Sequence, residues 1–423
     1  MNAPLAGTSA ASFLARYDGL ADRLPGSRRQ REAAAELLRE AGLPGPRSET
    51  WKYTSLRALS DIAFHEALTE AGDHPAPAAL PNLGALADAA RLVFAAGRFR
   101  ADLSILPTHV QFRRFADAPD LGRAREDDPL FALNTLLTED GAVLEIAPGT
   151  DAGLLVVIHI GSDLNGAPAS FHPRHTVRLG EGAALTLVDM AVGSGTYLHN
   201  PVTDIELAEG ARLAHLRLQA ESAQAFHLGA VHARVADDAS YDSFTLVAGG
   251  RLARSEIHAR LTGPRAHAAL NAAQMLRGRQ HADFTTIVSH DAPHGTSRQT
   301  VKNVLDGHAR GVFQGKIEVA PGAQKTDGYQ MNQALLLSPD AEIDSKPQLE
   351  IFADDVKCSH GATVGELDAD QLFYLTSRGI PRPEASGMLV RAFLGEALAL
   401  VQDDDARALF DSVLQAWWEE GAP

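Results

Sequence analysis

Short runs of alternating hydrophobic and polar residues recur along the middle of the chain, and a turn of acidic, glycine or proline residues follows each run. The run Val177-Arg178-Leu179, for example, ends in the turn at Glu181. The next turns come at Glu209 and Asp237, at steps of 28 residues, and then at Gly263, 26 residues further on. Alternation predicts β-strands, and repetition at a nearly constant period is typical of a solenoid. We therefore expect a parallel β-helix, while a β-sandwich remains the alternative because it also gives short strands and turns.

The beginning of the chain has a helical pattern instead. Ser27 is a suitable N-cap for a helix over residues 28–40, and Gly42 ends that helix. Residues 73–81 are rich in proline and alanine, which is the composition of a linker. A domain boundary is therefore expected near residue 85.

The pattern becomes helical again near the end of the chain. Asp368 and Gln371 have the spacing of a capping box, and further helices are expected from Pro383 and after residues 403–405. Two interpretations of these helices remain open. They form a small bundle that packs on the β domain and caps its open end, or they provide a docking surface for a partner.

The sequence thus divides into three predicted domains. The first, residues 1–85, is helical, and the second, residues 86–363, is the parallel β-helix core. The third, residues 364–423, is helical again. The predicted fold class is therefore mainly β.

Composition excludes several classes of partner. The chain has 45% hydrophobic and 22% charged residues, as ordinary globular proteins do, but a formal charge of −16 at pH 7. Nucleic acids and anionic membranes both attract a basic surface, so neither is expected as the main partner. No apolar stretch approaches the length of a membrane span, and the N-terminus lacks the pattern of a secretion signal. We expect a cytoplasmic protein.

The residue pair Cys358 and His360 is the main candidate for chemistry. Cys358 is the only cysteine of the 423 residues, so an internal disulfide is excluded. In an extended strand, residues i and i+2 project to the same face, so the thiol and the imidazole are expected side by side. Both are metal ligands. The alternative is a buried structural cysteine beside a hydrogen-bonded histidine.

Sequence signatures of catalysis are missing. Residues 311–317 resemble a phosphate loop, but only three residues separate the glycines and Ile317 stands where a serine or threonine must bind magnesium. The motifs HExxH, GxSxG and CxxC are also absent. His290 and His294 flank a proline-containing turn, and we expect both imidazoles to be exposed rather than to bind a metal.

Three motifs together resemble a known family. Residues 354–365, which contain Lys357-Cys358-Ser359-His360, and residues 366–380 after them look like the C-terminal signature of the SufD family, the scaffold subunits of the SUF iron–sulfur cluster assembly machinery. Residues 48–54 resemble the N-terminal motif of that family, and residues 310–316 match a core motif shared with the paralogue SufB. The resemblance spans the whole chain. SufB normally carries further cysteines, which this chain lacks.

The resemblance implies a right-handed parallel β-helix flanked by helical domains, in a protein that is not an enzyme. It implies pairing with SufB along the β-helix, with a homodimer as the alternative for the isolated chain, and docking of the SufC ATPase on the C-terminal helices. The implied metal or sulfur site falls on His360, with Cys358 beside it and further ligands from SufB. It implies no tightly bound cofactor in the isolated chain. A transient iron ion or iron–sulfur cluster at the SufB interface is expected, and the chain would aid iron acquisition.

For the contact with SufC, we expect side chains of the first two C-terminal helices. These are Leu372, Phe373, Tyr374, Arg378, Met388 and Phe393.

Two other functions remain open. One is a β-helix enzyme such as a polysaccharide lyase or a cupin-like metal hydrolase, although the secretion signal or clustered acidic and arginine residues of such enzymes are not found in the sequence. The other is a purely structural subunit that stabilises SufB and contributes no ligand. Whether a flavin takes part is also left open.

Overall fold

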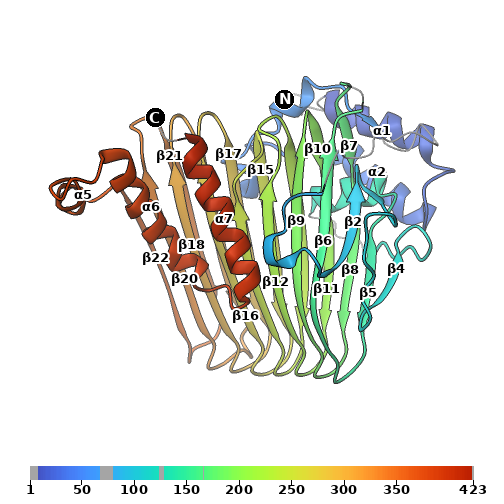
Figure 1. Cartoon of the computed structure of the whole chain (residues 1–423). Coiled ribbons are helices and arrows are strands. Elements are labelled where there is room, and N and C mark those ends of the chain that lie inside the picture. Colours follow the sequence, from blue (N-terminus) through green and yellow to red (C-terminus); the bar gives the residue numbers. More distant parts are fainter. Residues whose placement is uncertain (1–7, 67–79, 123–127, 165, 422–423) are drawn as a thin grey trace.

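The computed structural model describes residues 8–66, 80–122, 128–164 and 166–421. It is a parallel β-solenoid of about eight turns with helices at both termini, which confirms the predicted fold class. Figure 1 shows the strands running side by side along the whole molecule. The three domain limits stay predictions, and residues 73–79 of the expected linker lie outside the described residues.

Each turn of the solenoid gives one strand to each of two sheets. The first sheet has twelve strands, and its main path is β21 (Glu342–Ile351), β19 (Arg310–Val319), β17 (His281–His290), β15 (Leu252–Leu261), β13 (Phe226–Val235), β11 (Val202–Leu207), β8 (Arg174–Leu179), β5 (Ala142–Ile146) and β4 (Gln111–Arg114). The short strands β1 (His65–Glu66), β7 (Ala169–Phe171) and β10 (Tyr197–His199) join it at the side.

The second sheet has ten strands. Their order is β22 (Lys357–Gly365), β20 (Asp327–Leu336), β18 (Thr296–Leu305), β16 (His267–Leu276), β14 (Ser240–Val247), β12 (Arg212–Ala220), β9 (Ala184–Ser194), β6 (Asp151–Ser162), β2 (Ala90–Ala95) and β3 (Arg98–Phe99). All neighbours are parallel except β2 with β3 and, in the first sheet, β4 with β5. A β-sandwich, which is built from antiparallel hairpins, is therefore excluded.

Equivalent residues of successive turns stack inside the solenoid. Ile205 pairs with Val177, 28 positions earlier, and also with Ala233, 28 positions later. The row continues through Ala259 and Val288, and all five side chains are buried. Because paired residues of a parallel ladder point to the same face, the constant repeat length keeps this hydrophobic row continuous.

One corner of the solenoid uses left-handed backbone in seven successive turns. The residues, with φ between 53° and 68°, are Gly149, Gly182, Gly210, Asp238, Arg265, His294 and Lys325. The N–H of each donates to a carbonyl of the next turn, as from Gly182 to Glu209 at 2.8 Å. Four of the seven are not glycine and cost about 1–2 kcal/mol each in this region. The corner hydrogen bonds offset part of that cost because each pairs the N–H of a left-handed residue with a carbonyl.

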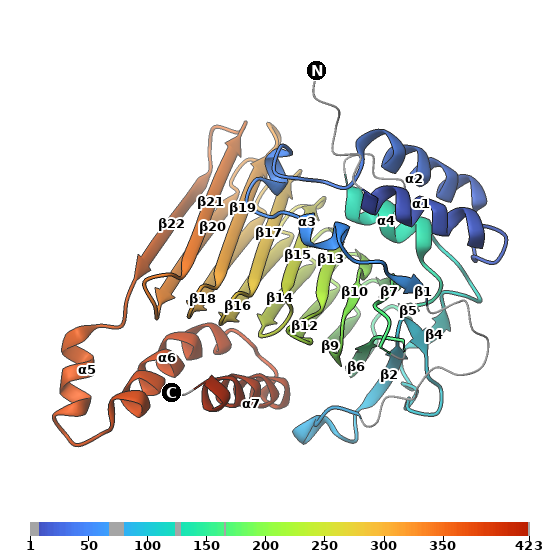
Figure 2. The same ribbon diagram turned by 90° about the horizontal axis from the view of Figure 1, so that it is seen from above.

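The N-terminal helices lie against the twelve-stranded sheet, as Figure 2 shows. They are α1 (Thr8–Leu20), α2 (Arg28–Ala41), η1 (Glu49–Trp51) and α3 (Arg57–Ser60), together with α4 (Pro129–Leu137) from within the β region. The short η3 (Gly84–Leu86) lies instead on the side of the ten-stranded sheet, beside the C-terminal helix α7 (Asp404–Gly421). Ser27 caps α2 through a hydrogen bond from the Gln30 N–H, and Gly42 ends it, as predicted.

Residues 49–54 fasten the N-terminal segment to the sheet. The buried Trp51 ring lies 4.0 Å from the guanidinium carbon of Arg254. Arg254 and Gln314 both donate to the Thr50 carbonyl, at 2.9 and 3.1 Å. Arg254 is itself paired with Asp283, a fully buried carboxylate. The motif that resembles the family's N-terminal signature therefore has a structural role in holding this segment on the solenoid.

The C-terminal helices are α5 (Ala369–Thr376), α6 (Arg382–Leu398) and α7 (Asp404–Gly421). Asp368 caps α5, as predicted, by accepting from the Gln371 N–H at 2.9 Å. Helices α6 and α7 lie across the outer face of the ten-stranded sheet (Figure 2), where Phe410 stacks on Phe244. The expectation that this bundle caps the open end of the solenoid is therefore wrong, although it does pack on the β domain.

A second expectation is also corrected. His290 is not exposed, because it points into the solenoid, is fully buried and shares a hydrogen bond with Ser297 Oγ at 2.9 Å. His294 is exposed at its corner, as expected. No helix of the described residues is long and apolar enough to cross a membrane.

Replacing Trp51 with alanine tests the fastening of the N-terminal segment. Loss of a buried tryptophan typically costs about 3–5 kcal/mol, and here it also uncovers the buried Arg254. We expect Trp51→Ala to lower Tm and to make the bonds before residue 64 sensitive to limited proteolysis. Lys52→Ala, at an exposed neighbouring position, is the control and should change neither. An unchanged Tm for Trp51→Ala would contradict the assignment.

Candidate functional site

Cys358 and His360 lie on β22, the last strand of the solenoid, and face its interior. Cys358 pairs with Gly328 of β20, and His360 pairs with Gln330. Residues 328 and 330 share a face with the interior residue Val301 of β18, through the parallel register. The two predicted ligands therefore point to the same side, at the mouth of the solenoid, where no further turn covers His360.

The Cys358 thiol is half-buried in a small hydrophobic cluster. Its neighbours there include Ile317, Val319 and Ala353, which are all buried. Burial raises the pKa of the thiol above its ordinary value, and a backbone hydrogen bond from Gly328 offsets this only in part. Cys358 is therefore a protonated thiol at neutral pH, and it becomes a ligand or nucleophile only when something removes its proton.

The interior of the last turns contains several amide and hydroxyl side chains. Asn303 donates to Asn332 at 2.7 Å, and Asn332 donates to Ser345 Oγ at 3.1 Å. Gln330, the partner of His360 in the register, is fully buried, and its amide nitrogen and oxygen have no hydrogen-bond partner within the described parts of the chain. Polar groups thus line the interior next to His360, so this end of the solenoid can accommodate a polar or charged species.

Next to the thiol, the surface has a shallow hollow of about 410 Å³. Its lining residues are Arg298, Asp327, Tyr329, Lys357, Cys358 and Ser359. The hollow gives solvent species access to the strand that carries both predicted ligands.

Strands β21 and β22 end their sheets, because each has only one neighbouring strand in its sheet. Long unpaired edges are rare in monomers, since their free N–H and C=O groups invite another strand. Large apolar side chains beside these edges are also exposed, with Phe352 at 67% and Val364 at 55%. The end of the solenoid that carries Cys358 and His360 therefore has the properties of an interface.

The six side chains expected to contact a partner fall into two groups. Phe373, Tyr374, Arg378 and Met388 are exposed, and Arg378 lies over the Tyr374 ring at 4.2 Å. Leu372 is buried and Phe393 is half-buried, with Lys302 Nζ 4.2 Å from its ring. Figures 1 and 2 show α5 projecting away from the sheets. The exposed group is free to contact a partner, while Leu372 and Phe393 stabilise the chain itself.

Two clusters of potential ligands were not predicted from the sequence. One is fully buried between the sheets, where Glu221 accepts from His199 Nδ1 at 3.1 Å and from His227 Nδ1 at 2.7 Å. Burial lowers the pKa of His227, and the two imidazoles hold the pKa of Glu221 down against the effect of its own burial. The second cluster contains Asp128, His232 and His258.

Comparisons with known proteins identify the family. The profile of the family described as "SUF system FeS cluster assembly, SufBD core domain" matches residues 161–393. The iron–sulfur cluster assembly protein SufD of Escherichia coli (strain K12) is 33% identical over 387 residues, which are 90% of each chain. A SufBD family protein of Synechocystis is 32% identical, over 87% of this chain and 86% of its own length. The chloroplastic protein ABCI7 of Arabidopsis thaliana is 29% identical, over 88% of this chain and 82% of its own length.

The chain therefore belongs to the SufBD family of the SUF iron–sulfur cluster assembly system. Within that family it is a SufD-type protein. These relatives support a role in iron–sulfur cluster assembly and give no support to a polysaccharide lyase or a cupin-like hydrolase.

Alkylation of Cys358 tests the environment of the thiol. Because burial raises its pKa, the thiolate fraction at pH 8 is smaller in the folded chain than in the unfolded chain. We expect iodoacetamide to react more slowly with the native protein than with the protein in urea, with the native rate still rising above pH 9. The single cysteine makes mass spectrometry a direct measurement. Equal rates in the two states would show that the thiol is not shielded.

Proposed function

We propose that this chain is the non-ATPase scaffold subunit of a SUF assembly complex, in which it pairs with SufB, docks the SufC ATPase and aids iron acquisition. The observation that carries the proposal is the open end of the solenoid. There, Cys358 and His360 face a polar interior beside two unpaired strand edges.

The ligand set at this end is incomplete on one chain. An iron–sulfur cluster is commonly held by about four thiolate or equivalent ligands. Cys358 and His360 supply two, and no further cysteine exists in the chain. The proposal is therefore that a cluster or an iron ion binds transiently between chains, with the remaining ligands from SufB. In this role the cluster is the cargo of the complex rather than a resident cofactor.

The strand edges support pairing of the solenoid with another solenoid. An added strand can hydrogen-bond along β21, which has ten residues, or β22, which has nine. Such pairing would cover Phe352 and Val364 and would enclose His360. In this arrangement the site forms only when the complex forms.

Helix α5 supports docking of the ATPase. It presents Phe373 and Tyr374 to solvent, and exposed aromatic side chains are typical of binding hot spots. The neighbouring helix α6 is tied to β18 by an ion pair between Glu396 and Lys302 and by Phe393 over the same lysine. A movement of α5 and α6 driven by nucleotide on SufC would thus reach the solenoid near its open end. ATP hydrolysis itself belongs to SufC, since residues 311–317 cannot form a phosphate loop.

Replacement of His360 tests the ligand assignment. The chain is co-expressed with SufB and SufC, and iron and sulfide are measured on the purified complex for the wild type and for His360→Ala. We expect an intact complex with most of its iron lost, because a ligand is missing. The control is His308→Ala, which removes an exposed imidazole elsewhere and should leave iron unchanged. Unchanged iron in His360→Ala would reduce the chain to a structural subunit without ligands.

Two charge substitutions separate the two proposed interfaces. We expect Phe373→Glu to abolish SufC binding in a pull-down and to leave SufB pairing intact, because it places a carboxylate on the exposed face of α5. We expect Phe352→Glu, on the open end, to do the reverse. Each variant is the control for the other, and both should keep the wild-type Tm because both positions are exposed. Loss of both contacts in either variant, or of neither, would contradict the placement.

A further inference from the structure

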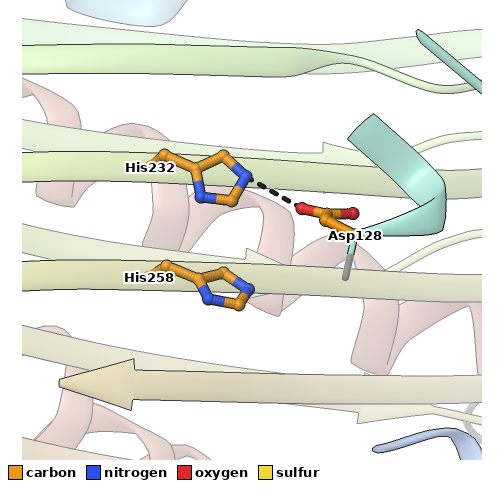
Figure 3. Close-up of side chains that lie close together, drawn as sticks. All are labelled: Asp128, His232 and His258. Carbon is orange, nitrogen blue, oxygen red and sulfur yellow. Dashed lines mark hydrogen bonds and ion pairs between the residues drawn. The ribbon is translucent and has the colours of Figure 1, made fainter. Parts of the chain in front are cut away.

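Two histidines occupy equivalent places in successive turns on the outer face of the twelve-stranded sheet. His232 of β13 pairs with His258 of β15 in the parallel register, so their side chains lie on the same face. The rings are 4.8 Å apart between centroids, with an interplanar angle of 30°. Figure 3 shows both rings extending from their strands toward the side on which Asp128 lies.

Asp128 brings a carboxylate to these two imidazoles. It is the N-cap of α4, where one oxygen, Oδ1, accepts from the Phe131 N–H at 2.9 Å. The other oxygen, Oδ2, lies 2.9 Å from His232 Nε2 (Figure 3). One ligand atom of each of the three residues lies within 4.8 Å of the other two. The helix cap therefore fixes a carboxylate oxygen beside two nitrogen ligands.

The surroundings of the three residues favour a cation. Glu256 Oε2 lies 3.4 Å from His258 Nε2, and Glu256 accepts from Arg254 at 2.6 Å. Arg254 is also paired with Asp283, so this one guanidinium is shared by two carboxylates.

An ion can reach the cluster from solvent. His232 and His258 line an open groove along the sheet, with a volume of about 1240 Å³. Asp128 and His232 are buried, while the side chain of His258 is 31% exposed and forms the boundary with the groove. The site thus combines a buried, oriented pair of ligands with one ligand at its entrance.

We propose that Asp128, His232 and His258 bind one divalent first-row transition-metal ion. Two histidines and one carboxylate are the donor set of mononuclear Fe(II) sites with open positions, and the same donors bind Zn(II). Metal–ligand bonds of about 2.1 Å place ligand atoms at most about 4.2 Å apart, so small rotations of the side chains are enough to close the site. Glu256 adds a further carboxylate oxygen beside His258 Nε2.

Binding requires one proton to move. With Asp128 ionised, the contact between its Oδ2 and His232 Nε2 is a hydrogen bond donated by the imidazole N–H. The metal takes the place of this proton, which passes to Nδ1 of the same ring or to solvent. No electron is transferred in this step.

This site is separate from the one proposed for cluster assembly. It lies on β13, β15 and α4, on the outer face of the sheet, whereas Cys358 and His360 lie on β22 and face the interior. Strands β17 and β19 separate β15 from the open edge at β21. The inference therefore does not depend on the proposed role of His360.

Titration of the purified full-length chain with Co(II) tests the proposal, because bound Co(II) gives absorption bands in the visible range. We expect one Co(II) per chain with nitrogen ligation, and Fe(II) competing for the site under anaerobic conditions. His258→Gln removes the most exposed ligand and should weaken binding by at least about tenfold, since even the loss of a second-shell partner costs 10–100-fold. Asp128→Asn keeps the helix cap and should weaken binding similarly.

Two controls make the outcome decisive. His308→Gln removes an exposed imidazole outside the cluster and should leave Co(II) affinity unchanged. His360→Ala should also retain the site, so failure of one proposal is distinguishable from failure of the other. Tm without metal verifies that His258→Gln and Asp128→Asn are folded. Equal affinity of the wild type and folded His258→Gln, or loss of the site in His360→Ala, would overturn the assignment.

Discussion

The backbone hydrogen bonds between successive turns of the solenoid are the constraint on which the rest of this structure depends. Each interior strand bonds to the strand one turn before it and the strand one turn after it, without a change of direction. This works only if every turn has nearly the same length and closes its corner in the same way. The left-handed corner from Gly149 to Lys325 meets that demand even where the sequence supplies an arginine or a histidine instead of glycine.

Stacking in register also decides which side chains meet. It places His258 beside His232 and Gln330 beside His360, although about 30 residues separate each pair. The same rule sets the composition of the interior, because one row can hold a hydrophobic side chain in one turn and an amide in the next, as where Val301 is followed by Asn332. In this fold, side chains that act together are therefore found at equivalent positions of successive turns more often than close together in the sequence.

The repeat could be predicted from the sequence because each turn has the same pattern of hydrophobic and polar residues. The helix caps at Ser27 and Asp368 could be predicted because capping depends only on residues close in the sequence. The position of the C-terminal helices was not predictable in this way, since a helical pattern does not show which surface the helix packs against. His290 was misjudged because its neighbouring proline indicated a turn, whereas its position on β17 points it inward. The motif His-Ala-Arg at residues 232 and 258 did contain a signal, but the contact with Asp128 joins residues 104 positions apart.

The two ends of the solenoid differ in a way that limits assembly. At the N-terminal end the sheets finish in β3 and β4, strands of two and four residues that turn back antiparallel and leave little edge for another chain. At the other end, β21 and β22 are long and open. A molecule with open strand edges at only one end can pair with one other molecule through that end. End-to-end association therefore stops at a pair and cannot continue into a filament. Short terminal strands thus protect a solenoid, whose repeating form otherwise lends itself to fibres, from polymerisation.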